Sequence, residues 1–156
     1  MKQRLQIGFT IIELLIVVTM IAALAVIAIP TYHRYVIKTQ RQAVQARLME
    51  MSAILENHYS QKGAYWSDFV GQLNSDTVYN RFPDAKKSRY LIKIAVIDSD
   101  GVEIIPSSDR EATPYQLYLI KATPTALGNQ RSDYCGTLTV NNFHIKGADS
   151  DRCWSF

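Results

Sequence analysis

Near its N-terminus the chain reads Gly8-Phe9-Thr10-Ile11-Ile12-Glu13-Leu14-Leu15-Ile16-Val17-Val18, and apolar residues continue from there to Ile29. A helix of about twenty residues crosses a hydrocarbon core of roughly 30 Å, so this segment is long enough to span a membrane. Its only formal charge is Glu13. A carboxylate at the centre of a bilayer costs about 3 kcal/mol unless it is paired or protonated. The sequence therefore predicts a partner for Glu13.

Length and composition are those of one ordinary domain with a membrane segment attached. The chain has 156 residues, of which 47% are hydrophobic and 20% charged, which is far from the composition of a disordered chain. The net charge is +3, but Lys2 and Arg4 precede Gly8, so the remainder carries only +1. A remainder so close to neutral gives little support for a dedicated nucleic-acid binder.

The order of features at the N-terminus differs from that of a secretory signal peptide. Such a peptide has a basic region, a short apolar run and then a cleavage site with small residues. Here the basic leader covers residues 1–8, its small residue Gly8 stands before the apolar run, and no comparable site follows Ile29. A cut after Gly8 would keep the hydrophobic helix in the mature protein and make Phe9 its first residue.

This order resembles the class III signal of type IV pilins and their pseudopilin relatives. Four features match: glycine before the cut, phenylalanine after it, glutamate at the fifth mature position, and the leucine that follows. The alternative is an ordinary signal anchor with an accidental acid, and the cost of a buried charge argues against it.

The resemblance implies a processing and assembly route. A membrane prepilin peptidase would cut between Gly8 and Phe9, and the new amine of Phe9 would be methylated. With an inner-membrane assembly platform, the mature chain would leave the lipid and join other pilin subunits in a filament. There the α-amine of Phe9 on one subunit can pair with Glu13 of a neighbour, and the low dielectric makes that pair select one axial register.

Charge alone does not settle the orientation in the membrane. Lys2 and Arg4 favour a cytoplasmic leader, yet Arg34, Lys38 and Arg41 flank the other end of the apolar run. The leader and the cysteine pair together favour a single-pass protein of the inner membrane, with its N-terminus in the cytoplasm and its domain in the periplasm. The resemblance places the assembled chain in an extracellular pilus.

A single kinked helix is predicted from the membrane segment, residues 9–30, into the head domain, residues 31–156. Pro30 should bend this helix without ending it, and Gly63 is a plausible cap after Lys62. Apolar residues at helical spacing predict a buried face: Tyr32, Tyr35, Val36, Val44, Leu48, Met51, Leu55 and Tyr59. The charged residues Arg34, Lys38, Arg41, Arg47 and Glu50 are expected largely on the solvent face. Pilins that unwind this helix often have a glycine within the apolar run, where this chain has Ala22-Ala23.

An antiparallel sheet is predicted for the second half of the head domain. Residues 63–88 are expected to be an irregular stretch in which Lys62-Gly63-Ala64-Tyr65-Trp66 begins a loop over the helix; a binding platform is the less favoured alternative. Strands are expected at residues 89–97, 102–105 and 115–123, and at 137–141 together with 143–146. The short turns between them, such as Asp98-Ser99-Asp100-Gly101, indicate antiparallel pairing against the helix.

The two cysteines are close together near the C-terminus. Outside the cytosol, Cys135 and Cys153 are expected to form one disulfide, and closing a loop of this size is worth roughly 3 kcal/mol. The stretches Cys135-Gly136-Thr137-Leu138 and Cys153-Trp154 resemble the C-terminal half of PilE-like minor pilins. The fold class is therefore predicted to be α+β, a type IV pilin fold with a long kinked helix, an antiparallel sheet and a C-terminal disulfide-bounded loop.

No cofactor, metal site or enzymatic centre is predicted. His33, His58 and His144 are scattered, and the chain has neither a nucleophile elbow nor a glycine-rich phosphate loop. The stretch Asp98-Ser99-Asp100-Gly101 starts like a calcium loop but lacks its spacing, so a turn is favoured over a calcium site there. Asp149 and Asp151 are interpreted as solvated loop acids rather than ion ligands.

These patterns predict a structural subunit of a type IV pilus, minor rather than major. At class level the resemblance implies pilus assembly, twitching motility, adhesion or DNA uptake. One alternative is a pseudopilin of a type II secretion system, which a disulfide loop argues against. The other is a DNA-binding pilin of a competence pilus that uses the exposed cations Arg81, Lys86, Lys87 and Arg89.

Overall fold

The computed structural model describes residues 9–63, 65, 68–75, 77–97, 103–104 and 117–154. The chain divides into two compact units, one up to Val36 and the other from Ile37 onward. The leader, including Gly8, lies outside the described residues, as do Ala64, Trp66 and the turn at residues 98–101.

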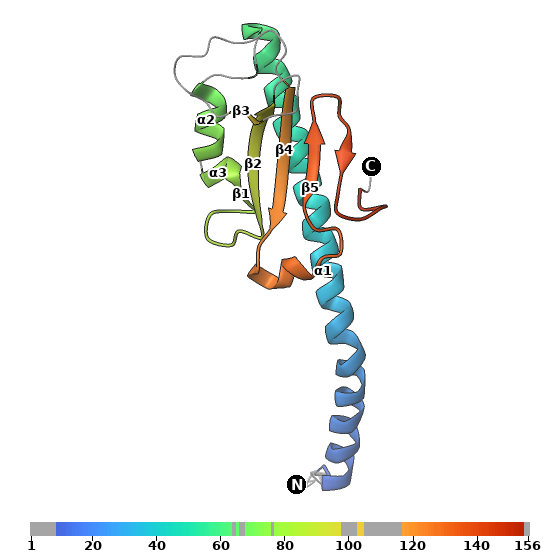
Figure 1. The fold of residues 1–156 in the computed structure, drawn as a ribbon. Coiled ribbons are helices and arrows are strands. Elements are labelled where there is room, and N and C mark those ends of the chain that lie inside the picture. The colour runs from blue at the N-terminus through green and yellow to red at the C-terminus, as the bar shows by residue number, and fades with distance from the viewer. Residues whose placement is uncertain are drawn as a thin grey trace, which may run out of the picture. The chain divides into compact units, whose positions relative to one another are not determined.

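The first unit is the apolar half of one long helix, α1, which runs from Ile11 to Lys62 (Figure 1). Its most apolar stretch has a mean hydropathy of 2.9 and none of that stretch is buried, so by length and composition the helix could cross a membrane. It continues through Pro30 without a break. The predicted helix is therefore confirmed, and the bend at Pro30 stays a prediction.

The second half of α1 covers the sheet with one face. Val44, Leu48, Met51 and Leu55 are at most 1% exposed, and their spacing of three and four residues places them on one side of the helix. They pack in a single core with residues of the sheet such as Ile94, Tyr118, Ile120, Leu138 and Val140. The predicted buried face is confirmed at these four positions, whereas Tyr32 and Tyr35 are exposed.

The sheet is antiparallel, as expected. Among the described residues its order is β1-β2-β4-β5-β6, and β3 pairs with β2 beside β1. The strands are β1 (Arg81–Phe82), β2 (Tyr90–Ile97), β3 (Glu103–Ile104), β4 (Leu117–Pro124), β5 (Leu138–Asn141) and β6 (Lys146–Gly147). The predicted strands are confirmed within about two residues, except that residues 142–145 form a turn rather than strand. A 3₁₀ helix, η1 (Leu127–Ser132), connects β4 to the C-terminal loop.

The expectation of an irregular stretch at residues 63–88 was wrong in part. Helices α2 (Asp68–Ser75) and α3 (Thr77–Asn80) form there and lead into β1. Val70 and Leu73, three residues apart, are the buried side of α2. Eight residues with a glycine among them are too short to give a clear periodic signal, so the helix was missed.

α2 also protects an exposed edge of the sheet. Because β1 and β3 have two residues each, no described strand pairs with the middle of β2 on that side. The side chain of Asn74 bonds this part of β2 in place of a strand. Its Nδ2 donates to the Ile94 carbonyl and its Oδ1 accepts from the Ile94 N–H, both at 2.8 Å. An unpaired strand edge invites association with other chains, and the Asn74 amide removes that opportunity.

Tyrosines close the core at the end of α1. Tyr65 is 7% exposed, stacks on Tyr59 and meets Tyr118 edge to face, so the prediction of a covering loop is confirmed at this residue. Both Tyr65 and Tyr118 donate to the carboxylate of Glu56. Burial raises the pKa of Tyr118 to about 12 and that of Tyr65 further still. These phenols therefore stay protonated at neutral pH and hold the loop onto the helix.

An ion pair ties α1 to the C-terminal loop. Arg41, expected on the solvent face, is instead 7% exposed, and its Nη1 lies 2.6 Å from Oδ1 of Asp133. Asp133 also accepts from the Tyr90 hydroxyl and the Cys135 N–H. We call Arg41 and Asp133 the clamp. The helical pattern could not reveal the clamp, because its carboxylate lies 92 residues away along the chain.

We predict that Asp133→Asn destabilises the head domain by about 3 to 5 kcal/mol, because it leaves the Arg41 guanidinium buried without its counter-charge. Urea unfolding of the detergent-solubilised chain, read by pulse proteolysis, measures the loss. Glu50→Gln is the matched control: it removes the exposed Arg47–Glu50 pair, whose side chains are 19% and 55% exposed against 8% and 1% for the clamp. That change should cost under about 1 kcal/mol. Equal losses in both variants would contradict the role given to the clamp.

Candidate functional site

Glu13 lies in the first turn of α1, where the helix begins with a reciprocal cap. Its Oε2 accepts from the N–H of Thr10 at 3.0 Å and from the hydroxyl of Thr10 at 2.7 Å. In return, the N–H of Glu13 donates to the Thr10 hydroxyl at 3.3 Å. This is the capping box of a helix N-terminus, in which a Thr and a Glu three residues later satisfy each other's donors. The Thr10-x-x-Glu13 spacing was visible in the sequence and could have predicted it.

Because of this cap, Glu13 has a structural role within its own chain, separate from any contact with another subunit. It satisfies one carboxylate oxygen, while no described residue bonds the other, Oε1. Phe9, the residue before the cap, is 86% exposed. The arrangement can therefore hold a carboxylate in an apolar segment and leave one of its oxygens to accept from a group outside the chain.

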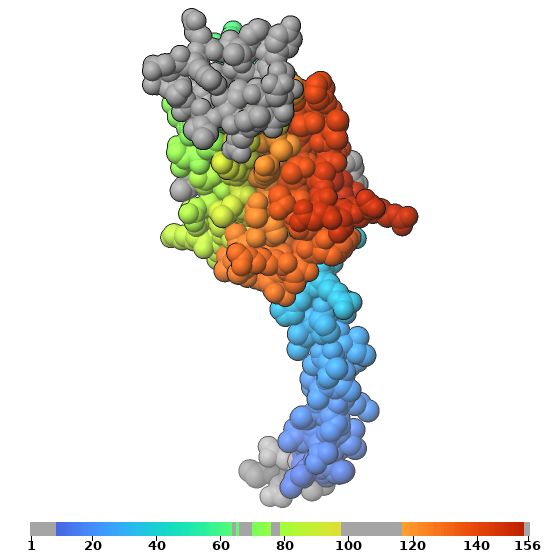
Figure 2. Space-filling view, viewed as in Figure 1, coloured from blue at the N-terminus to red at the C-terminus, as the bar shows by residue number. Residues whose placement is uncertain are grey.

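A second candidate surface is the face of the sheet turned away from α1. Figure 2 looks onto this side, where β2, β4 and β5 lie next to one another. The outward positions of β2 and β4 place Lys93 directly opposite Lys121 in the register, with Thr139 of β5 next in the row. The register therefore brings two cationic side chains together on this face, and the pair is a candidate for contact with an anion.

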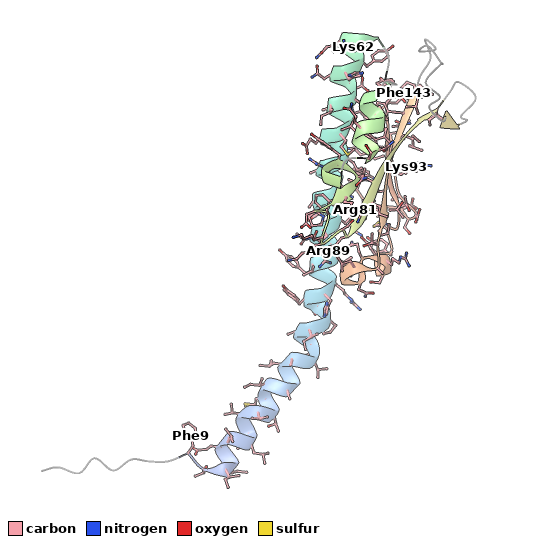
Figure 3. All side chains as sticks on the ribbon, turned by 90° about the vertical axis from the view of Figure 1, so that its left-hand side faces the viewer. Phe9, Lys62, Arg81, Arg89, Lys93 and Phe143 are labelled. Atoms are coloured by element: carbon pink, nitrogen blue, oxygen red, sulfur yellow. A yellow bond between two sulfur atoms is a disulfide. The ribbon has the colours of Figure 1, made fainter. Side chains whose placement is uncertain are left out.

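Further cations lie close to this row. Arg81 of β1 is paired with Leu91 and is exposed, while the Nη1 of Arg89 donates to the Gly128 carbonyl at 3.3 Å. Figure 3 shows Arg81, Arg89 and Lys93 along the sheet, whereas Lys62 stands at the end of α1. The described outward positions of β1, β2, β4 and β5 carry no acidic residue, whereas Glu103 of β3 is paired with Ile97 at the end of β2. We call Arg81, Arg89, Lys93 and Lys121 the basic face.

Two of the cations expected to bind DNA lie beside this face, on the turn after β1. The Oδ1 of Asp84 accepts from the backbone N–H groups of Lys86 and Lys87, both at 2.8 Å. This bonding fixes the turn and leaves both lysines exposed. The sequence had marked Arg81, Lys86, Lys87 and Arg89 but missed Lys93 and Lys121, because their pairing depends on strand register.

The predicted disulfide between Cys135 and Cys153 is present. Asp149 is exposed, as expected of a solvated loop acid, and it also accepts from the Thr137 N–H at 2.9 Å. A Cβ at Gly136, whose φ is +55°, would collide with that carboxylate, so glycine is required here. Asp151 is exposed. Asp149 therefore closes the loop structurally.

In the described part of the chain, no three His, Cys, Asp or Glu side chains are grouped so that they could hold a metal ion. His33 and His144 are exposed, and His58 is half-buried on α1. The histidines therefore add no second site to the surfaces above.

The comparisons with known proteins agree with these features. The family model described as "Type IV minor pilin ComP, DNA uptake sequence receptor" matches residues 30–139, well over half of the chain. The chain belongs to the type IV pilin family. The matching model is that of a minor pilin, so the resemblance seen in the sequence is confirmed.

Curated relatives of this pilin are fimbrial proteins. It is 34% identical over 116 residues to the type IV major fimbrial protein FimA of Dichelobacter nodosus, covering 69% of this chain and 74% of FimA. It is 37% identical over 82 residues to the fimbrial protein EcpC of Eikenella corrodens, covering 53% of this chain and only 54% of EcpC. A solved type IV pilin from Shewanella oneidensis aligns with a TM-score of 0.47 and 22% identity, covering 77% of this chain and 99% of that one.

Proposed function

We propose that this pilin is a minor subunit of a type IV pilus, with no enzymatic activity of its own. In this proposal it is inserted in the inner membrane with its N-terminus in the cytoplasm. Prepilin peptidase cuts it between Gly8 and Phe9, the Phe9 amine is methylated, and the assembly platform moves the chain into the filament. The observation that carries the proposal is a capped acid, Glu13, at the start of an exposed apolar helix in a chain of the pilin family.

The geometry supports a specific role for each residue at this end. Thr10 satisfies Oε2 of Glu13 and so reduces the cost of carrying the carboxylate through lipid. Oε1 is then available to the amine of Phe9 from a neighbouring subunit. The uniformly exposed apolar helix supplies the area that packs against other helices, and the charged pair supplies the register.

We predict that Gly8→Leu leaves a full-length precursor in the membrane, because a bulky side chain cannot enter the site that accepts glycine. Intact-mass spectrometry of the membrane fraction would show residues 1–8 retained and no methyl group added at Phe9. Gln6→Ala is the control, and it should be processed normally. Normal cleavage of Gly8→Leu would place the cut elsewhere.

A second prediction concerns Glu13 and Thr10. Glu13→Gln should insert in the membrane as the wild type does but enter filaments at least tenfold less, because the amide carries no charge for the neighbouring amine. Thr10→Val should cause a smaller loss, since it removes a cap worth about 1 kcal/mol and leaves the carboxylate in place. Thr10→Ser, which keeps the hydroxyl, is the control. The measurement is the ratio of sheared to membrane-bound protein, and wild-type incorporation of Glu13→Gln would contradict the pairing.

A second candidate function is DNA binding by the basic face. Two observations favour it: the matching family is described as a DNA uptake sequence receptor, and Lys93 and Lys121 lie side by side on the outward face of the sheet. Phosphate groups would supply negative charge beside these two lysines. Lys86 and Lys87, on the turn after β1, would extend the contact along a DNA backbone.

We predict that the full-length protein in a neutral detergent binds duplex DNA, with an affinity that falls steeply as salt rises. Replacing Lys93 and Lys121 by Gln should weaken binding and reduce the slope of log K against log salt by about 2, roughly one for each phosphate that a lysine no longer neutralises. Lys62→Gln, at the end of α1 in Figure 3, is the matched control and should change neither quantity. No binding at low salt, or an equal effect of Lys62→Gln, would contradict a DNA contact on this face.

A further inference from the structure

Three segments of the head domain meet at the end where α1 enters it. η1 is held to the helix because the Nε2 of Gln130 donates to the Ile37 carbonyl at 3.3 Å. The turn between β1 and β2 is held to the start of the η1 segment, since the Thr125 hydroxyl donates to the Ser88 carbonyl at 2.7 Å. Figure 1 shows η1, in orange, beside α1 at this end of the sheet. The helix, the turn and η1 therefore present one ordered surface.

This surface collects cations from all three segments. They are Lys38 on α1, Lys86 and Lys87 on the turn, Arg89 at the start of β2, and Arg131 on η1. Arg89 is half-buried and donates to the Gly128 carbonyl of η1, whereas the other four are exposed. We call these five side chains the cationic rim.

Other charged groups next to the rim do not cancel it. They are Asp84 on the same turn, Asp149, Asp151 and Arg152 on the disulfide loop, and the neutral pairs Arg41–Asp133 and Arg47–Glu50. With all of them counted, this end of the domain keeps three net positive charges, whereas the whole chain after Gly8 carries only +1. Cations are therefore concentrated where α1 enters the domain, and acids are in excess elsewhere.

Large side chains with apolar area are exposed at the same end. Leu127 of η1 is 46% exposed and Tyr134 is 64% exposed, with the Arg41 guanidinium 5.1 Å from the centre of the Tyr134 ring. On α1, just before the rim, Tyr32 and Tyr35 are each 66% exposed. Tyrosine is enriched at the headgroup level of membranes, because its ring is apolar and its hydroxyl is polar. Cations and exposed tyrosines together suit the surface of an anionic bilayer.

The chain itself keeps the rim close to any bilayer that α1 spans. Lys38 follows Ile29, the last residue of the apolar run, by nine residues in the same helix, which is about 14 Å of helix. The headgroup layer adds roughly 6 Å to each side of the hydrocarbon core, and charges act across a Debye length of about 8 Å. Headgroups are therefore within electrostatic reach of the rim, whereas a DNA duplex would have to arrive by diffusion.

We propose that, before assembly, the cationic rim docks the head domain on anionic phospholipid headgroups of the membrane that α1 spans. The inference rests on the membrane insertion given under the proposed function, and it names what the head domain contacts in that state. Headgroup phosphates lie beside the exposed cations, and Leu127 and Tyr134 enter the headgroup layer. Moving the chain into a filament then requires these contacts to break, in addition to removing the helix from lipid.

Photo-crosslinking to lipid tests this docking. The full chain carries p-benzoylphenylalanine in place of Leu127 and is reconstituted in nanodiscs of phosphatidylcholine alone, or of one part phosphatidylglycerol to two parts phosphatidylcholine. Mass spectrometry should find at least fivefold more lipid adducts in the anionic nanodiscs. The same group in place of Phe143, which is 65% exposed and which Figure 3 shows far from Arg89, should form few adducts in either.

Matched variants test the cations, with the probe kept at position 127. Arg131→Gln should lower the adduct yield in anionic nanodiscs about fivefold, because each cation near an anionic surface strengthens binding by roughly that factor. Lys62→Gln removes an exposed cation at the other end of α1 and should leave the yield within twofold. Lys86→Gln combined with Lys87→Gln should lower the yield further than Arg131→Gln does, and it tests the rim without altering η1.

The outcomes separate this inference from the proposed function. A probe in place of Val26, which is 75% exposed in the apolar half of α1, should form lipid adducts in both kinds of nanodisc. Its failure would overturn the proposed membrane insertion and, with it, the docking. Adducts at position 26 but none at 127, or equal yields at 127 in neutral and anionic nanodiscs, would overturn the docking alone. So would a double variant of Lys86 and Lys87 that loses DNA binding but keeps its lipid adducts, because those lysines would then serve DNA.

Discussion

The head domain depends on a charge that one helix buries. Arg41 stands on the face of α1 that otherwise carries only a few polar groups, and its guanidinium is acceptable there only because Asp133 meets it at 2.6 Å. Asp133 is in turn held by the Tyr90 hydroxyl and the Cys135 N–H, so strand, helix and disulfide loop meet at one carboxylate. The neighbouring turn of the helix repeats the arrangement, since Gln45 donates to the Cys153 carbonyl at 2.7 Å. The loop is therefore fixed to α1 at both of its cysteines, by the clamp at one and by Gln45 at the other.

At the other end of α1, too, a charged side chain is held by hydrogen bonds from a nearby residue. Glu13 could be carried as a bare carboxylate only at a cost of about 3 kcal/mol in lipid. Thr10 reduces this cost through two hydrogen bonds, and the same bonds begin the helix. In the proposed assembly route, Thr10 alone would satisfy the acid in lipid, and an amine would reach Oε1 in the filament core. The cap itself does not require the helix to unwind near Ala22 or Pro30.

The sequence predicted well those features that local patterns control. The apolar run, the spacing of Val44, Leu48, Met51 and Leu55, and the paired cysteines each depend on neighbours along the chain. The clamp, the Asn74 bonds to Ile94 and the Lys93–Lys121 pair depend on contacts between distant segments. For these, the sequence shows only a charge or an amide, and the fold decides whether it lies in solvent, in the core or opposite a like charge. Arg41 was misplaced for this reason, since a basic residue on a helix is usually exposed.

The two faces of the sheet carry different groups. α1 and the core occupy the inner face, whereas the outward face of β2, β4 and β5 carries Lys93 opposite Lys121. The proposed assembly uses the apolar half of α1, and the proposed DNA contact uses the outward face of the sheet, so neither contact takes residues from the other. A head domain with modest net charge can still offer a polyanion a local contact, because strand register rather than composition brings the two lysines together.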